Sequence, residues 1–151
     1  MTSHRSPAPT GAHGPGRGRR ALHLARDRSA AAEARAFAQA TLDSWHADAA
    51  VLHDALVVVS ELVSNAIEHG GGDPVLELHR HGDRVLVRVS DDDPRVPRVQ
   101  QFDLTARRGR GLMIVQAMAH RWGHEQDAGR KWVWAEMPLV TRSATADGSL
   151  V

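Results

Sequence analysis

The sequence predicts an α+β fold, a two-layer sandwich in which helices and antiparallel hairpins form separate layers. Two observations carry this prediction. Short segments with alternating apolar residues occur in pairs around tight turns, which is typical of antiparallel hairpins. Longer segments of helical composition are set apart from these pairs along the chain. With 151 residues, of which 42% are apolar, the chain is long enough for one domain with a real core.

The first half of the chain contains a short strand and two helices. Residues 20–25 alternate in character, with Leu22 and Leu24 on one side, which predicts a strand. The Ala, Arg, Gln and Leu content of residues 30–45 favours a helix. A second helix is predicted over residues 49–69, and the glycines that follow it are a common helix ending.

The second half contains two hairpins, a long loop and one more helix. Residues 74–80 and 84–91 alternate on either side of a turn at Gly82, which predicts the first hairpin. The remaining elements are a loop over residues 92–108, the turn Gly109-Arg110-Gly111, a helix over residues 112–119, and hairpin strands over residues 122–126 and 131–137. A loop of this length inside a compact domain is usually functional or disordered.

Both ends of the chain are predicted to lie outside the domain. Residues 1–19 consist mainly of Pro, Gly, Ser and Arg, so we expect a disordered tail there. Residues 141–151 are expected to form a flexible C-terminal tail. The domain itself should therefore cover residues 20–140.

Composition excludes several classes of function. The net charge of +1 argues against nucleic-acid binding. The sequence has no cysteine, which excludes disulfides, thiolate catalysis and cysteine-based zinc sites. We find neither a signal peptide nor an apolar run of membrane-spanning length. The expected protein is therefore cytoplasmic and makes no contact with a membrane.

A polar stripe interrupts the most apolar helix of the chain. Glu61, Asn65 and His69 recur every four residues between apolar positions, so they share one narrow stripe of a helix. Such a stripe either faces water on a core helix or presents a carboxylate, a carboxamide and an imidazole to a ligand. The helix alone does not decide between these two interpretations.

Two further features suit a nucleotide. Asp91 stands at the end of a predicted strand, where a carboxylate can accept a hydrogen bond from an exocyclic amine. The turn Gly109-Arg110-Gly111 precedes a helix, whose N-terminal N–H groups and dipole favour phosphate oxygens. The amide oxygen of Asn65 is a reasonable ligand for Mg²⁺. These residues together predict a site for a magnesium nucleotide.

In combination these features resemble the GHKL ATPase superfamily, the Bergerat-fold ATP-binding domains found in histidine kinases and gyrase. Residues 61–69 (ELVSNAIEH) resemble its N-box, Asp91 the aspartate of its DxGxG box, and residues 109–112 (GRGL) its GxGL box. The greatest similarity is to single-domain anti-sigma-factor serine/threonine kinases and their actinobacterial relatives. The resemblance covers roughly residues 20–139 and implies a mostly antiparallel sheet covered on one face by helices.

The resemblance also implies cofactors and a role for each residue. ATP and Mg²⁺ are the implied cofactors. Asn65 would coordinate Mg²⁺, Glu61 would act as the acid/base group that polarises the nucleophile, and Asp91 would receive the adenine amino group. The implied cofactor-binding set is completed by His69, Arg108, Gly109, Arg110, Gly111 and Leu112.

Some positions keep two interpretations. The run after Asp91 is DDDPR, so Asp93 and Arg95 stand where the family has glycine. The charge of Asp93 should weaken ATP binding unless Arg95 or Mg²⁺ offsets it. His69 either faces the ligand or complements the helix dipole. The arginines that flank the glycines either neutralise the γ-phosphate or form an ordinary solvated run.

The implied function is an ATP-binding regulatory protein, specifically an anti-sigma-factor-type serine/threonine kinase. Such a kinase would bind a sigma factor or phosphorylate an antagonist protein. The alternative is a non-catalytic nucleotide-sensing or protein-binding regulator with a degenerate ATP site, which the DDDPR run favours. Homodimerisation is a further implication of the resemblance. Trp122, Trp132 and Trp134 are expected to pack on strands rather than stack on a base, and Trp45 is a hypothetical subunit contact.

Overall fold

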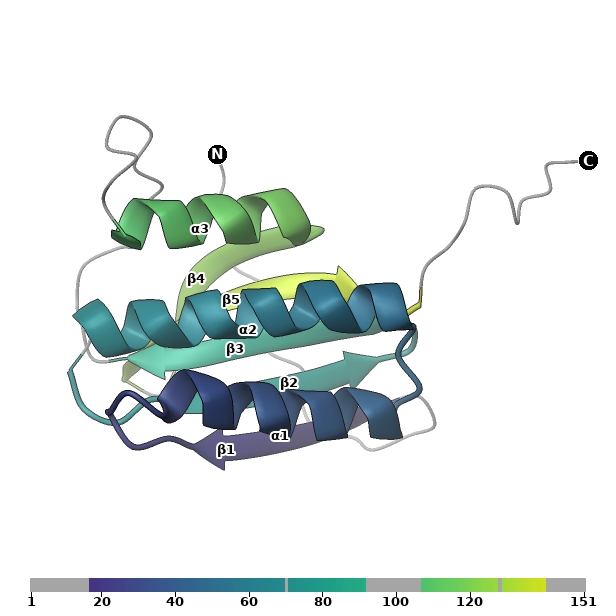
Figure 1. Cartoon of the computed structure of the whole chain (residues 1–151), viewed down its shortest axis with the longest axis horizontal. Coiled ribbons are helices and arrows are strands. Elements are labelled where there is room, and N and C mark those ends of the chain that lie inside the picture. Colours follow the sequence, from purple (N-terminus) through teal and green to yellow (C-terminus); the bar gives the residue numbers. More distant parts are fainter. Residues whose placement is uncertain (1–16, 70, 92–106, 128, 141–151) are drawn as a thin grey trace, which may run out of the picture.

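The chain folds as a two-layer α+β sandwich (Figure 1). The computed structural model describes residues 17–69, 71–91, 107–127 and 129–140. Within these ranges, the strands form one five-stranded antiparallel sheet in the order β1-β2-β3-β5-β4, and three helices cover one of its faces. The predicted fold class is therefore confirmed.

Each described element lies close to its predicted position. The strands are β1 (Arg17–His23), β2 (Val75–His81), β3 (Arg84–Asp91), β4 (Arg121–Asp127) and β5 (Arg130–Pro138). The helices are α1 (Ala30–Ser44), α2 (Ala49–His69) and α3 (Arg107–Met118). Gly82 and Gly129 have φ angles of 61° and 80°. Both hairpin turns therefore use the left-handed conformation that glycine adopts readily.

The core fills the space between the sheet and the helices. On β3, the side chains of Val85, Val87 and Val89 point into it and are almost fully buried. The residues opposite them on β2 and β5 share this face, because directly paired residues in an antiparallel sheet lie on the same side. Leu86, Arg88 and Ser90 consequently point to the other side of the sheet.

The helix α2 is the centre of the helical layer and lies between α1 and α3. Seven of its residues are buried: Val51, Ala55, Val58, Val59, Leu62, Val63 and Ala66. Burial of each such valine or leucine contributes about 1.5–3 kcal/mol relative to an exposed side chain. This apolar face explains why α2 keeps its predicted bounds.

The same helix contradicts the prediction that the chain has no apolar segment of membrane-spanning length. By length and composition α2 is long and apolar enough to cross a membrane. Its apolar residues, however, pack against the sheet and the neighbouring helices. A core helix passes the same test, which considers only length and composition.

The boundaries of two elements differ from prediction. The strand β1 begins at Arg17, inside the segment predicted to be disordered, because residues 17–19 pair with residues 79–81 of β2. The helix α3 begins at Arg107 rather than at Leu112. The rest of the N-terminal tail, the C-terminal tail and residues 92–106 of the predicted loop lie outside the described residues.

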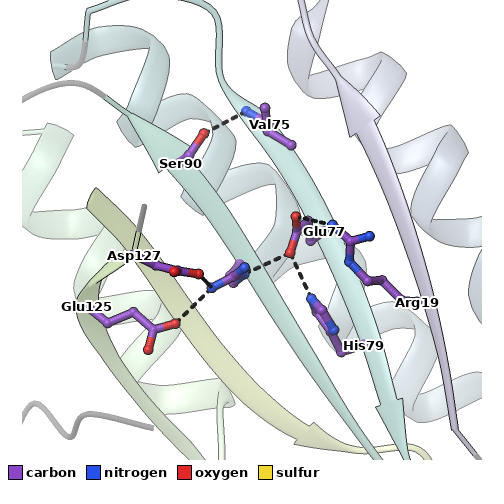
Figure 2. A network of polar contacts seen from close by, with 8 residues as sticks. Arg19, Val75, Glu77, His79, Ser90, Glu125 and Asp127 are labelled. Atoms are coloured by element: carbon purple, nitrogen blue, oxygen red, sulfur yellow. Dashed lines mark hydrogen bonds and ion pairs between the residues drawn. The ribbon is translucent and has the colours of Figure 1, made fainter. Parts of the chain in front are cut away.

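A buried ion network occupies the far face of the sheet, which we define as the face turned away from the helices (Figure 2). The Arg88 guanidinium donates to Glu77 Oε1 and to Glu125 Oε2, each at 2.9 Å. Arg19 donates to Glu77 Oε2 at 2.8 Å, and His79 Nε2 lies 2.8 Å from Glu77 Oε1. Because the charges are paired, Glu77 and Arg88 remain buried, each with 5% of its surface exposed.

The network sets the protonation of Glu77. Burial alone would raise its pKa, but the hydrogen bonds from His79, Arg88 and Arg19 outweigh burial and lower the pKa to about 2. A depressed carboxylate pKa stabilises the fold at pH values above the unfolded pKa. This contribution disappears as the pH falls through the folded pKa.

The first prediction is a loss of stability in acid. Between pH 4.5 and about pH 2 the free energy of unfolding should fall by about 3 kcal/mol through Glu77. Denaturant titrations across this range measure the slope of the free energy of unfolding against pH. The slope should be markedly smaller in Glu77→Gln, whereas Glu33→Gln, which removes an exposed carboxylate of α1, should keep it. An unchanged slope in Glu77→Gln would refute this role of the network.

Candidate functional site

Three element ends converge at one end of the molecule, on the left in Figure 1. They are the C-terminal ends of α2 and β3 and the N-terminal end of α3. The last turn of α2 is held there by Arg26, whose guanidinium donates to the carbonyl oxygen of Ile67 at 2.7 Å. The end of β3 is held by Ser90, whose hydroxyl accepts from the backbone N–H of Val75 at 3.0 Å. The residues predicted to bind a nucleotide therefore come from ends that the fold brings together.

The polar stripe of α2 is separated from the apolar face of the helix. Glu61, Asn65 and His69 are all partly exposed, whereas Leu62 and Ala66 beside them are buried. This arrangement follows from the spacing of four residues, which keeps all three polar side chains on one side. The geometry of the stripe is thus as predicted, and its role in binding stays a prediction.

The side chain of Asn65 carries a buried acceptor. Its Oδ1 atom has no hydrogen-bond partner in the described part of the chain, a state that it shares there with Thr41 Oγ1 and the indole N–H groups of Trp132 and Trp134. A buried carbonyl oxygen without a partner costs about 1–3 kcal/mol, so proteins seldom keep one without a reason. An amide oxygen is also a hard ligand of the kind that Mg²⁺ prefers. Asn65 therefore fits the metal role that the sequence suggested.

The described residues offer a metal ion few other protein ligands. No group of three or more His, Cys, Asp and Glu side chains among them is placed to hold a metal. A cation at Asn65 would need most of its ligands from elsewhere. This is the usual situation for Mg²⁺, which commonly takes one or two protein ligands and completes its shell with substrate phosphates and water.

His69 lies beside Glu68 at the end of the polar stripe. The Nε2 atom of His69 lies 3.5 Å from Glu68 Oε1, and 21% of the histidine side chain is exposed. As the last residue of α2, His69 can complement the helix dipole and still face a ligand. Both interpretations of His69 consequently remain open.

Asp91 is buried beside a lysine that the sequence analysis did not connect with it. The Lys131 Nζ atom lies 3.3 Å from Asp91 Oδ1, and the two residues are directly paired across β3 and β5. The only available signal was that Lys131 is the single lysine of the chain. The pairing depends on the register of two strands far apart in sequence, which local patterns do not give.

The glycine-rich segment is part of α3 and does not precede it. Gly109 and Gly111 lie within the first five residues of the helix. Burial of Leu112 and Val115 in the core outweighs the helix penalty of glycine, which is about 1 kcal/mol per residue. Because the first intrahelical donor is the fourth residue of a helix, the N–H groups of residues 107–109 lack a partner within α3, whereas those of Arg110 and Gly111 are in position to bond inside it. The side chains of Arg108 and Arg110 lie outside the described residues.

The tryptophans pack as predicted on the strands. Trp132 and Trp134 are buried on the far face, where the Arg88 guanidinium lies 3.9 Å from the centre of the Trp132 ring. Trp122 packs against the core. Trp45, proposed as a subunit contact, also packs against the core, and its ring lies close to Gly18 of β1. An intramolecular role therefore accounts for its partial burial.

A cavity of about 670 Å³ lies at the other end of α2 and is lined by Ala50, Asp83 and His120, among others. Ala50 and Asn65 are fifteen residues apart on one helix, which corresponds to about 22 Å along its axis. This cavity is therefore separate from the candidate nucleotide site.

Comparisons with known proteins agree with the fold. Residues 24–137 match the family model of the histidine kinase-like ATPase domain. The fold is similar to the crystal structure of the RsbU and RsbW domains of Rv1364c from Mycobacterium tuberculosis, with a TM-score of 0.61 and 24% sequence identity. The similarity covers 81% of this chain and 32% of that chain. No protein of curated function matches the sequence.

Proposed function

The chain belongs to the histidine kinase-like ATPase domain family, and on that premise we propose that it is an anti-sigma-factor-type serine/threonine kinase. Membership of the family implies an ATP-binding domain. The observation that carries the proposal is the buried Oδ1 atom of Asn65, which has no partner in the described part of the chain. An acceptor kept in this state at the predicted metal position is explained by a cation that arrives with the nucleotide.

Asn65 would hold Mg²⁺ through its amide oxygen, together with the phosphates of ATP. When bound, the ion would supply positive charge that offsets the charge of the phosphates. The N–H groups of residues 107–109 at the start of α3 would bind phosphate oxygens, since they lack partners within the helix and lie at the positive end of its dipole. Asp91 would accept a hydrogen bond from the adenine amino group.

Glu61 is the residue that we assign to the chemistry. It lies one helical turn before Asn65 on the same stripe of α2. Its carboxylate would accept the proton of a serine hydroxyl on the acceptor protein, which makes the oxygen a better nucleophile. The expected partners are a sigma factor and an antagonist protein that carries this serine.

The kinase proposal predicts a specific effect of Glu61→Gln. This variant should transfer phosphate at least about a hundredfold more slowly, because a general base contributes about 10²–10⁴-fold. It should still bind ATP. The assay follows transfer of the labelled γ-phosphate of Mg-ATP to purified antagonist proteins encoded in the same genome. Asp54→Asn, which changes a carboxylate near the other end of α2, is the matched control and should be fully active.

A second candidate function is a nucleotide-sensing regulator that binds ATP without transferring phosphate. The acidic run after Asp91 favours it, because the charge of Asp93 would oppose the phosphates of the nucleotide. Under this alternative the wild-type protein binds ATP, phosphorylates none of the antagonists and is unaffected by Glu61→Gln.

A further inference from the structure

The ion pair between Asp91 and Lys131 is almost completely shielded from water. The side chains are 4% and 7% exposed, and the Nζ and Oδ1 atoms are 3.3 Å apart. Burying two charges is costly unless they are well paired. A pair in this position, formed by the only lysine of the chain, therefore calls for a functional explanation as well as a structural one.

Both side chains point to the side of the sheet where the nucleotide is proposed to bind. Asp91 shares its face with Val89, and Lys131 shares its face with Val133, and both valines belong to the core under the helices. The positive charge of Lys131 also acts on His124 of the neighbouring strand. Burial lowers the pKa of His124, and the charge of Lys131 lowers it further. Lys131 is thus a cation on the same side of the sheet as α2.

An aspartate beside a lysine offers a ligand an acceptor next to a donor. A carboxylate has two acceptor oxygens and an ammonium group has three donors, so each can serve more than one partner. The edge of adenine is complementary to this arrangement, because its exocyclic N–H donor lies next to the ring nitrogen N1, which is an acceptor. Guanine in the same orientation would place its carbonyl oxygen against the carboxylate and its ring N–H against the ammonium.

We propose that Lys131 is a second base-recognition residue, which donates a hydrogen bond to N1 of adenine while Asp91 accepts from the amino group. This inference rests on the proposed function, because it assigns Lys131 to the same nucleotide site. It makes Lys131 a specificity-determining residue that favours adenine over guanine and hypoxanthine.

The test compares ATP with an analogue in which a C–H group replaces ring nitrogen N1. Wild-type protein should bind the analogue about tenfold more weakly than ATP, since a hydrogen bond to a charged donor is lost. Lys131→Met should bind ATP more weakly than wild type does and should no longer distinguish the two nucleotides. Lys131→Arg should restore part of the distinction, because it keeps a charged donor. Calorimetry measures all these affinities.

Arg130→Met is the matched control. It removes the same charge from the adjacent residue, which points to the far face and donates to the backbone oxygen of Asp73. It should distinguish the two nucleotides as well as wild type does. If Lys131 only kept Asp91 in place, Lys131→Met would weaken both nucleotides equally and the preference for ATP would remain. That outcome would overturn the proposal.

A second readout uses wild-type protein and does not depend on how the variants fold. Because the chain has one lysine, isotope-labelled lysine gives a single set of side-chain NMR signals. These signals should shift on saturation with ATP and shift less with the analogue. If the lysine signals did not change on a protein saturated with ATP, the role of Lys131 would be refuted and the proposed function would not. Absence of ATP binding to wild-type protein would instead refute the proposed function and this inference with it.

Discussion

Replacing Arg88 by methionine is expected to lower the free energy of unfolding by about 3–5 kcal/mol. Arg88 is the cation that joins Glu77, Glu125 and Asp127 on the far face of the sheet, with its nearest oxygens at 2.9 Å. Its removal leaves two almost fully buried carboxylates without their main counter-charge, and it also removes the contact with Trp132. Chemical denaturation of the purified variant measures the loss.

Arg84→Met provides the matched control for this experiment. Arg84 lies on the same strand and also contacts a glutamate, Glu136, but 47% of its side chain is exposed. An exposed ion pair contributes only about 0–1 kcal/mol. The contrast between the two variants therefore isolates the effect of burial. Equal losses in both would show that the far-face network is not a major source of stability.

Asn65→Ala is expected to reduce the affinity for Mg-ATP by on the order of a hundredfold, while the protein without nucleotide loses no stability. The first effect follows from the loss of the proposed protein ligand to Mg²⁺. The second follows from the buried Oδ1 atom, which has no partner in the described part of the chain and so adds nothing to folding. A residue kept for binding at a cost in stability shows this combination.

The control is Gln39→Ala, which removes an exposed carboxamide from α1. It should change neither the affinity nor the stability. Thermal unfolding of the two variants without nucleotide, and calorimetry with Mg-ATP, provide the measurements. A large loss of stability in Asn65→Ala would mean that the side chain is structural, and unchanged affinity would mean that it does not bind the metal.

Local sequence patterns predicted much of this fold. The helix α2 has its predicted bounds, and the strand β3 both starts and ends where its alternation indicated. In both elements the apolar side chains that the local pattern places on one side are the ones that are buried. Local spacing and tertiary packing therefore favour the same structure. The polar stripe of α2 was predictable for the same reason, since a spacing of four residues fixes one side of a helix.

Features that depend on strand register could not be predicted in this way. Asp91 meets Lys131, and Arg88 meets Glu125, only because β3 and β5 are neighbours in the sheet and β4 lies beside β5. The start of α3 was missed because packing against α2 outweighs the low helix propensity of its glycines. The domain bounds, the cytoplasmic location and homodimerisation stay predictions.

Calorimetric titration of the wild-type protein with ATP, in Mg²⁺ and then in excess chelator, tests the central claim most directly. The account predicts saturable binding of one ATP per chain in Mg²⁺ and clearly weaker binding once the metal is removed. Absence of saturable ATP binding up to millimolar concentration would contradict the nucleotide site itself. Binding of equal strength with and without Mg²⁺ would contradict the role assigned to Asn65.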